Sequence, residues 1–184
     1  KHMVGLVRPD SGKVLVDGED ITSFGERELF RVRRKFGFLF QGAALLDSLT
    51  VGENVGLGLR ELHTISPEET IRVVREKLAM VGLSGIEDAM PADLSGGMRK
   101  RVGLARAIAL EPEIVLYDEP TTGLDPVMSD VINELIVRLR DTLSITSVVV
   151  THDMISVRKV ADRVAMLFEG NIIFSGTVEE MDAT

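Results

Sequence analysis

Two carboxylates and a histidine closely follow separate apolar runs in this 184-residue sequence. Asp118 and Glu119 follow the run Ile114 to Tyr117, and His152 comes two positions after the run Ser147 to Val150. Such runs are typical of buried parallel strands, whose carboxyl ends meet at the edge where open α/β sheets bind ligands. One carboxylate there can hold Mg²⁺, and the other can orient water for attack on a phosphate. The pattern predicts the handling of a nucleoside triphosphate; a solvated Asp-Glu-Pro turn and an incidental surface histidine are the alternatives.

A second feature suited to phosphate is the tripeptide Ser95-Gly96-Gly97. Ser95 is placed as the N-cap of a helix that continues through Met98 to Ala109. The two glycines leave backbone N–H groups accessible at the positive end of the helix dipole. A helix start of this kind is a ready anion site. The alternative is that the tripeptide is only a flexible helix cap.

Hydrophobic patterning predicts the strands that hold these residues. Short β-branched runs alternate with segments of helical periodicity, which is typical of an α/β fold with a mainly parallel sheet. The runs before Asp118 and His152 are continuous, as expected for strands buried on both faces. A turn at Glu169-Gly170-Asn171 predicts a terminal hairpin. The predicted strands are Lys13 to Asp17, Phe36 to Phe40, Glu113 to Tyr117, Ile145 to Val150, Arg163 to Phe168 and Asn171 to Ser175.

Helical periodicity fills most of the segment from Gly42 to Ala109. Thr50 to Leu59 and Pro67 to Val81 are predicted helices, and proline suits the first turn of the second. Glu26 to Lys35 is a short charged helix or a loop. One more helix lies between the two continuous strand runs. The predicted apolar faces are Ile71, Val74, Leu78 and Val81 on the second helix, and Val131, Leu135, Ile136 and Leu139 on the last.

Composition limits the classes of protein that fit. With 45% hydrophobic residues, the chain can bury one core, or a core with a small attached subdomain. The sequence has no cysteine, which excludes disulfides and thiolate metal sites and fits a reducing cytoplasm. A net charge of −8 argues against nucleic acid as a partner. No apolar run approaches the roughly 20 residues of a membrane-spanning helix, so a membrane role would pass through a partner protein.

The order of the motifs resembles the ATP-binding cassette (ABC) family, the ATPase subunits of membrane transporters. The resemblance is carried by Leu94-Ser95-Gly96-Gly97-Met98-Arg99-Lys100-Arg101, Ile114 to Pro120 and Thr151-His152-Asp153. Met98 stands where most members have glutamine. The resemblance implies a P-loop NTPase-type (RecA-like) α/β fold, in which a mainly parallel sheet has flanking helices and an inserted α-helical subdomain, residues 42–109 in this chain. The cofactors that it implies are ATP and Mg²⁺.

The resemblance also implies roles for four residues near the predicted sheet edge. Glu119 is expected to be the catalytic base, and His152 is expected to contact the γ-phosphate and link it to that carboxylate. Asp118 is the acid expected at Mg²⁺. Gln41, which follows the run Phe36 to Phe40, is expected to reach Mg²⁺ and the attacking water.

Other expected roles belong to a dimer. In the family, two copies sandwich two ATP molecules, and each copy contributes to both sites. Ser95, Gly96 and Gly97 are therefore expected to bind the γ-phosphate of the nucleotide held by the other subunit. Asp125 falls on the loop that crosses the interface, and its alternative role is to cap the helix that begins near Pro126.

The Walker A pattern, a glycine-rich loop that ends in Gly-Lys-Ser/Thr and cradles phosphates, does not occur in this sequence. Lys1 to Gly12 instead resemble the end of the helix that follows this loop in the family. The expectation is a partial ABC ATPase domain over residues 1–184, with the first strands and the phosphate loop missing, that does not bind ATP tightly by itself.

Within the family, Gln41 to Val55 and Pro91 to Ser95 resemble the ATPases of phospholipid transporters that maintain outer-membrane lipid asymmetry, also described as organic-solvent-tolerance systems. This implies an integral-membrane permease as partner, a periplasmic lipid-binding component acting indirectly, and a place at the cytoplasmic face of the bacterial inner membrane. Ala43 to Leu46 then form a predicted docking surface. Polar amino-acid importers have similar segments. Two further classes stay open: a non-transport ABC ATPase, usually marked by a long coiled-coil insertion or two cassettes in one chain, and a nucleotide-dead interaction fragment.

Overall fold

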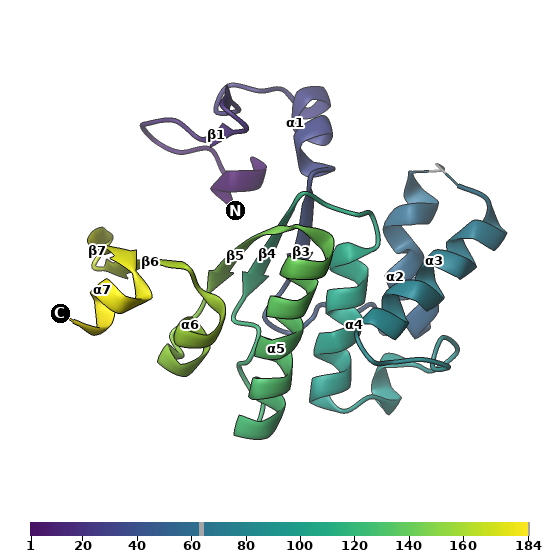
Figure 1. Cartoon of the computed structure of the whole chain (residues 1–184). Helices are drawn as coiled ribbons and strands as arrows, with labels where there is room; N and C mark the ends of the chain where they lie inside the picture. The colour runs from purple at the N-terminus through teal and green to yellow at the C-terminus, as the bar shows by residue number, and fades with distance from the viewer. Residues whose placement is uncertain (63–64, 184) are drawn as a thin grey trace.

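A three-stranded parallel sheet lies at the centre of the structure, a computed structural model that describes residues 1–62 and 65–183 (Figure 1). The strand order is β3 (Phe36–Leu39), β4 (Ile114–Asp118), β5 (Thr146–Val150). In register, Phe36 lies opposite Ile114, and Ile114 lies opposite Thr146. The predicted α/β class with a parallel central sheet is confirmed.

The two continuous apolar runs differ in burial. In the central strand β4, Val115, Leu116 and Tyr117 are buried, as predicted. The prediction was wrong for β5, where the strand residues are half-buried or exposed and Val150 is 56% exposed. The reason is position: β4 is the one strand of the described residues that pairs with β5, so β5 lies at an edge of this sheet.

The N-terminal residues form a small unit at the amino ends of the strands. It contains a 3₁₀ turn at His2–Val4, the short strands β1 (Leu15–Val16) and β2 (Glu19–Asp20), and α1 (Glu26–Arg33). Asp17 and Gly18 both have positive φ, 51° and 79°, as a two-residue hairpin turn requires. Val16, Ile21, Leu29 and Val32 make a separate core that packs against the first residues of β3 and β4, Phe36 and Ile114. In Figure 1 this unit lies above the sheet.

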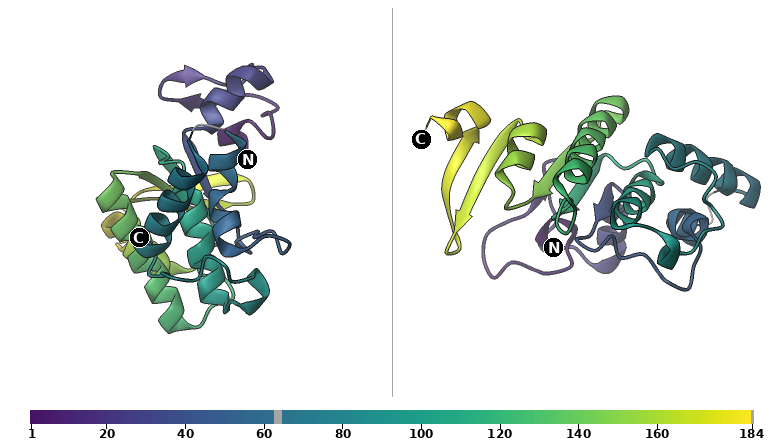
Figure 2. Two further views of the ribbon diagram at one scale, coloured as in Figure 1. Left: turned by 90° about the vertical axis from the view of Figure 1, so that its right-hand side faces the viewer. Right: turned by 90° about the horizontal axis from the view of Figure 1, so that it is seen from below.

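Between β3 and β4 the described residues contain helices and no strand, as predicted. These are α2 (Val51–Glu61), α3 (Pro67–Met80), a 3₁₀ turn (Pro91–Asp93) and α4 (Gly96–Ile108). Thr50 begins α2 with a capping box, in which its Oγ1 accepts from the Glu53 N–H and the Glu53 carboxylate accepts from the Thr50 N–H. Ser66 caps α3 ahead of Pro67. In Figure 2 α2 and α3 lie at the far end of the molecule from the C-terminus.

The inner face of α3 differs from the prediction at one residue. Val74 and Leu78 are buried, but Ile71 is 53% exposed, although seven residues separate it from Leu78 and helical periodicity puts both on one face. Ile71 lies near the start of α3, in a surface groove lined also by Arg60 and Pro67. The core reaches this end of the helix through Ile65 and the buried Thr70, and Ile71 faces the groove instead.

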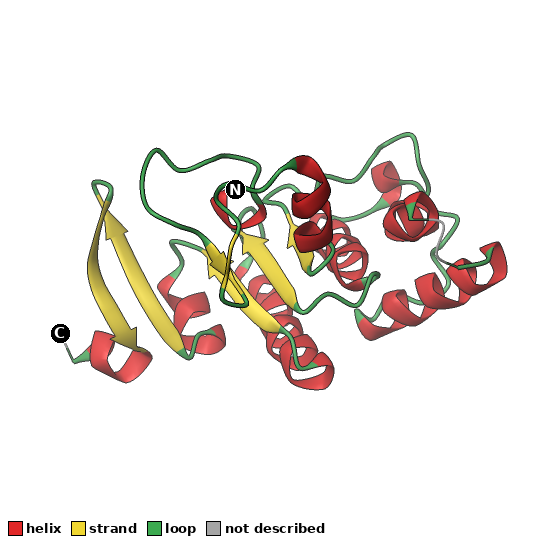
Figure 3. Cartoon of the chain, turned by 90° about the horizontal axis from the view of Figure 1, so that it is seen from above, coloured by secondary structure: helices red, strands yellow, loops and turns green. Residues whose placement is uncertain are grey.

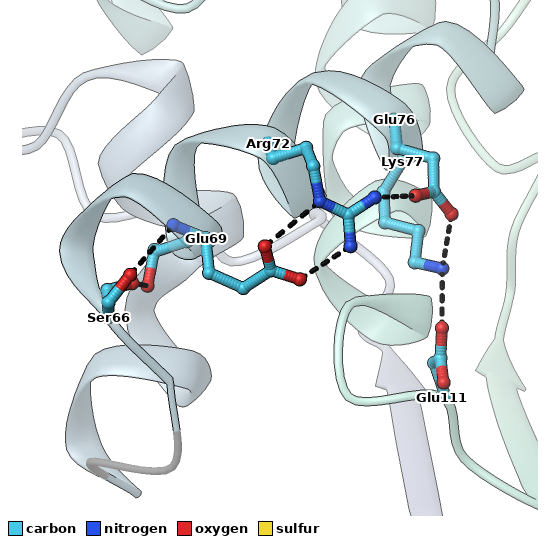
Figure 4. A network of polar contacts seen from close by, with 7 residues as sticks. Ser66, Glu69, Arg72, Glu76, Lys77 and Glu111 are labelled. Atoms are coloured by element: carbon cyan, nitrogen blue, oxygen red, sulfur yellow. Dashed lines mark hydrogen bonds and ion pairs between the residues drawn. The ribbon is translucent and has the colours of Figure 1, made fainter.

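A buried lysine joins α3 to the loop behind α4 (Figure 4). The Lys77 side chain is 2% exposed, and its Nζ lies 3.0 Å from Glu76 Oε1 and 3.1 Å from Glu111 Oε1. Burial would lower the pKa of Lys77, but the two carboxylates outweigh burial and raise it. Glu111 adopts φ 51°, a backbone conformation uncommon outside glycine. The ion pairs therefore fix α3 against a tight turn that leads into β4.

The long helix α5 (Pro126–Leu143) joins β4 to β5 and packs its apolar side on the sheet. Ile132, Leu135, Ile136 and Leu139 are buried, whereas the predicted core residue Val131 is 39% exposed. Val131 lines a surface groove with Arg101 and Arg138. Figure 3 shows α5 along one face of the three strands. The main core combines this helix with β3, β4, α2, α3 and α4.

The C-terminal residues form α6 (Met154–Val160), β6 (Arg163–Phe168), β7 (Asn171–Thr177) and α7 (Val178–Asp182). The predicted hairpin is confirmed: β6 and β7 pair antiparallel around Glu169 and Gly170, both with positive φ. Figure 3 shows this pair as a separate two-stranded sheet. Across residues 1–62 and 65–183, no helix combines the length and the apolar character that a bilayer crossing needs.

Candidate functional site

The carboxyl ends of the three parallel strands bring four predicted site residues to one edge of the sheet. Gln41 comes two residues after β3, Asp118 is the last residue of β4 with Glu119 next, and His152 comes two residues after β5. Because the strands are parallel and in register, these positions lie side by side at the arrowhead end of the sheet in Figure 1. Gln41 is exposed and Asp118 is half-buried.

Glu119 and His152 are in direct contact. His152 Nδ1 lies 2.9 Å from Glu119 Oε1, and the Thr122 hydroxyl donates to Glu119 Oε2 at 2.9 Å. The Glu119 backbone has φ 48°, and its N–H donates to the Val150 carbonyl at 2.9 Å, which ties it to the end of β5. Such strained backbone at a sheet edge is typical of functional sites. The carboxylate is thus oriented from both the β4 and the β5 side.

The contact changes the acidity of both groups. Burial would raise the pKa of Glu119, but its hydrogen bonds with His152 and Thr122 outweigh burial and lower the pKa. The same hydrogen bond with Glu119 raises the pKa of His152, whose side chain is 81% exposed. Glu119 is therefore ionised at neutral pH and available as a hydrogen-bond acceptor.

A buried polar network holds the loop of His152 against the loop that follows Glu119. Ser156, fully buried on α6, accepts a hydrogen bond from Asn133 Nδ2 at 2.9 Å and donates to Asp153 Oδ2 at 2.7 Å. Its hydroxyl also lies 3.4 Å from the Thr121 hydroxyl. Asp153 in turn caps α6 by accepting from the Ile155 N–H. The position of His152 is thereby linked to α5 and to the β4 loop.

The Gln41 loop corrects the predicted docking surface. Ala43 is fully buried and Leu45 is half-buried, whereas Ala44 and Leu46 are exposed. Ala43 and Ala44 have positive φ, 63° and 47°, and this turn directs Ala43 into the core, where the α4 residue Gly103 packs closely against it. The apolar run Ala43 to Leu46 therefore contributes to the core as well as to the surface.

Ser95, Gly96 and Gly97 lie at the start of α4. Ser95 is the N-cap, as predicted, and its Oγ accepts from the Met98 N–H at 3.2 Å. A Cβ on Gly97 would lie 2.4 Å from Met128 Cε, so the start of α4 lies directly beside the start of α5. In the described residues, no hydrogen bond or ion pair connects this tripeptide to Glu119 or His152.

Asp125 caps α5 by accepting from the Met128 N–H at 3.0 Å, the capping role that the sequence left open as an alternative. The predicted site residues thus form two groups. One is the sheet-edge group of Gln41, Asp118, Glu119 and His152. The other is the helix-start group of Ser95, Gly96, Gly97 and Asp125.

Lys100, like Thr122, is a residue at the sheet edge that the sequence reasoning missed. Its ammonium donates to the carbonyl oxygens of Gln41 and Glu119, the second at 3.0 Å. The signal was present, because Lys100 stands on the buried side of the predicted helix after Ser95, where an unpaired charge is costly.

The side chains at the sheet edge fit Mg²⁺ better than they fit a metal ion whose ligands all come from the protein. In the part of the chain that the structure describes, no group of three or more His, Cys, Asp or Glu residues is arranged to hold a metal ion. Mg²⁺ characteristically takes one or two carboxylates and obtains its other ligands from water and substrate phosphates. The half-buried Asp118 and the exposed Gln41 are a donor set of that kind.

Comparison with known proteins identifies the family. The family model described as "ABC transporter" matches residues 1–122. The fold is similar to "Dimeric structure of a post-hydrolysis state of the ATP-binding cassette MJ0796 bound to ADP and Pi", with a TM-score of 0.86 and 34% identity over 96% of this chain and 78% of that one. It is also similar to cbiO1 of Clostridium perfringens, with a TM-score of 0.89 and 31% identity over 99% of this chain and 72% of that one. The chain belongs to the ABC transporter family.

Two relatives of similar sequence are named for the transport of different compounds. The "Intermembrane phospholipid transport system ATP-binding protein MlaF" of Haemophilus influenzae is 44% identical over 182 residues, which are 98% of this chain and 69% of the relative. The "Probable ribonucleotide transport ATP-binding protein mkl" of Mycobacterium tuberculosis is also 44% identical, over 97% of this chain. The chain spans 50% of the length of the mycobacterial relative.

Proposed function

We propose that this chain belongs to the ATP-hydrolysing subunit of a bacterial ABC transporter. The observation that carries the proposal is the 2.9 Å contact between His152 and the Glu119 carboxylate at the carboxyl edge of a parallel sheet. An ionised carboxylate held by a histidine and a threonine hydroxyl is suited to orienting one water molecule. Phosphoryl transfer asks for such positioning and for charge neutralisation more than for covalent chemistry.

Each sheet-edge residue has a proposed role. Glu119 accepts a hydrogen bond from the attacking water and polarises it, and His152 keeps the carboxylate oriented while it contacts the γ-phosphate. Asp118 and Gln41 would hold Mg²⁺, which would supply charge neutralisation on the phosphates of ATP. Thr122 restrains the second oxygen of Glu119.

The helix-start group is proposed to act on a second copy of the chain. Ser95, Gly96 and Gly97 present the N-terminal N–H groups of α4 to the γ-phosphate of ATP held by the other subunit. Asp125 lies on the interface. The similar MJ0796 cassette is described as dimeric, which supports action in trans.

We further propose transport of phospholipids or other apolar compounds, in line with the phospholipid transport system for which the MlaF relative is named. The partners would be an integral-membrane permease and, indirectly, a periplasmic lipid-binding component, with the subunit peripheral at the cytoplasmic face of the inner membrane. Residues 42–109, which lie between β3 and β4, are the proposed helical subdomain inserted in the α/β core. The exposed residues Ala44 and Leu46 are the proposed permease contacts within the Gln41 loop.

Glu119→Gln in the intact protein tests the catalytic assignment. The amide keeps the shape of the side chain but is a poor base, so steady-state phosphate release should fall by at least about 100-fold while binding of Mg-ATP is retained. Glu61→Gln, at the exposed end of α2, is the matched control and should leave the rate unchanged. Phosphate release at the wild-type rate in the Glu119 variant would refute this role of Glu119.

A further inference from the structure

Lys100 lies on the first turns of α4 with 5% of its surface exposed, and it touches both catalytic loops. Its Nζ donates to the carbonyl oxygen of Gln41 and, at 3.0 Å, to the carbonyl oxygen of Glu119. We propose that Lys100 is a positioning residue that holds the Gln41 loop and the Glu119 loop in their mutual arrangement. The expected effect on catalysis rests on the proposed ATPase function. The expected effect on the arrangement of the two loops does not.

The two carbonyl groups depend on Lys100 to different degrees. In the described residues, no other hydrogen bond to the Gln41 carbonyl is found, while the Glu119 carbonyl also accepts from the Thr122 N–H at 3.3 Å. The loops come from different strands, β3 and β4, and the ammonium is a common donor to both. Hydrogen bonds from a charged donor are about twice as strong as neutral ones. Removing the ammonium should therefore release the Gln41 loop more than the Glu119 loop.

The burial of this charge is not explained by an ion pair. Lys100 forms none among the residues that the structure describes, and its two hydrogen-bond partners are both backbone carbonyls. A purely structural position on α4 would be filled at less cost by an apolar side chain. Lys100 is a charged donor to two backbone carbonyls, and it forms no ion pair with the carboxylates of Asp118 and Glu119. This combination suits a residue that orients backbone beside a reaction centre.

The helix that carries Lys100 adds a second consequence. Ser95, Gly96 and Gly97 form the start of the same helix, one turn away. In the proposed dimer, this start contacts the nucleotide of the other subunit, while Lys100 contacts the catalytic loops of its own subunit. If the nucleotide of the other subunit displaced α4, Lys100 would transmit that movement to Gln41 and Glu119 of its own subunit.

Lys100→Met tests the proposal, because methionine fills similar space and donates no hydrogen bond. In the intact protein we expect kcat for ATP hydrolysis to fall about 100-fold, as for a small misplacement of catalytic groups, with KM changed less than about threefold. Lys100→Gln should give an intermediate kcat, since its amide keeps two donors but ends one bond short. Lys13→Met, at a 74% exposed side chain, is the control.

Hydrogen exchange in the 184-residue chain tests the structural part without nucleotide. Lys100→Met should speed exchange of the backbone amides of residues 41–46 and, less strongly, of residues 119–124, and should leave those of β6 and β7 unchanged. Unchanged exchange in both loops would overturn the proposal, even if the wild-type protein proves to have no ATPase activity. Faster exchange with unchanged kcat would overturn the catalytic part. A lowered melting temperature with unchanged loop exchange would show a core residue only and would also overturn it.

Discussion

Glu119 is held by two partners at its carboxylate and by a third at its backbone N–H. His152 supplies an imidazole at 2.9 Å, Thr122 supplies a hydroxyl at 2.9 Å, and the Val150 carbonyl accepts from the Glu119 backbone N–H. The imidazole is largely exposed, so its charge state follows the solvent pH more closely than that of a buried histidine. The proposed catalytic carboxylate therefore has a pH-sensitive neighbour.

The shifted acidities of this pair predict how stability depends on pH. His152 has a pKa raised above its ordinary 6.5, so its contribution is fully present below pH 6.5 and is lost as pH rises through the folded-state pKa. Glu119 has a pKa lowered below its ordinary 4.5, so its contribution is present above pH 4.5 and is lost as pH falls through the folded-state pKa. The pair should therefore stabilise the fold most between pH 4.5 and pH 6.5, where both contributions are fully present.

NMR titration of the His152 ring and urea unfolding across pH check this prediction together. Glu119→Gln should move the His152 pKa down toward 6.5, and the stability difference between the two proteins should shrink on both sides of the window. An unchanged His152 titration in the variant would show that the contact does not persist in solution.

Most of the sheet-edge residues could be predicted because each follows its strand directly in sequence. A carboxylate or histidine within two residues of a continuous apolar run must lie at the carboxyl edge once the strands are parallel. Lys100 could not be placed in this way. Its partners are backbone carbonyls that lie 59 and 19 positions away along the chain, and no side-chain pattern marks them.

At the scale of elements, periodicity predicted helix faces well but not where the core ends. Ile71 and Leu78 share a face of α3, yet Leu78 is fully buried whereas Ile71 lines a surface groove. The same limit applies to β5, whose sequence resembles that of a central strand although it lies at an edge of the sheet. Burial depends on neighbouring elements, which the local pattern does not contain.

The ion pairs of Lys77 show how a buried charge is accommodated on α3 (Figure 4). Glu111→Gln removes one carboxylate from a buried ammonium and should lower the free energy of unfolding by about 1 kcal/mol. Lys77→Met leaves Glu76 and Glu111 with solvent contact, at 47% and 78% side-chain exposure, so its effect should stay within about 0.5 kcal/mol.

Urea unfolding measures both variants, with Glu69→Gln as the control. Glu69 pairs with Arg72 on the exposed side of α3, and loss of that pair should change stability by less than about 0.5 kcal/mol. If Lys77→Met proves more damaging than Glu111→Gln, the lysine stem would matter to packing more than the charge pairing does.

At the scale of the whole molecule, α4 and α5 begin side by side and each carries a side-chain cap. Ser95 and Asp125 accept hydrogen bonds from N–H groups of their helices, and at the start of α4 Ser95 and Gly96 are exposed whereas Gly97 is buried. Gly97 permits the close approach of the two helices. The two helix starts therefore lie together, and no hydrogen bond among the described residues joins Ser95 to the Glu119 carboxylate. Such a division suits a site completed by a second copy with two-fold symmetry.

Complementation between two inactive variants tests that division. Ser95→Asp should keep the cap of α4, because aspartate is a good N-cap, while its charge repels the γ-phosphate. Glu119→Gln should remove the base. In a mixed pair, the unmodified Glu119 of one subunit faces the unmodified Ser95 of the other, so one site is intact. Co-expression of the two variants of the intact protein should then restore roughly a quarter of the wild-type ATPase rate, since roughly half of randomly formed pairs are mixed. Co-expression of Ser95→Asp with the double variant Ser95→Asp/Glu119→Gln gives pairs that have no intact site, so this combination should stay inactive. If the two single variants remain inactive together, Ser95 does not act on the nucleotide of the other subunit.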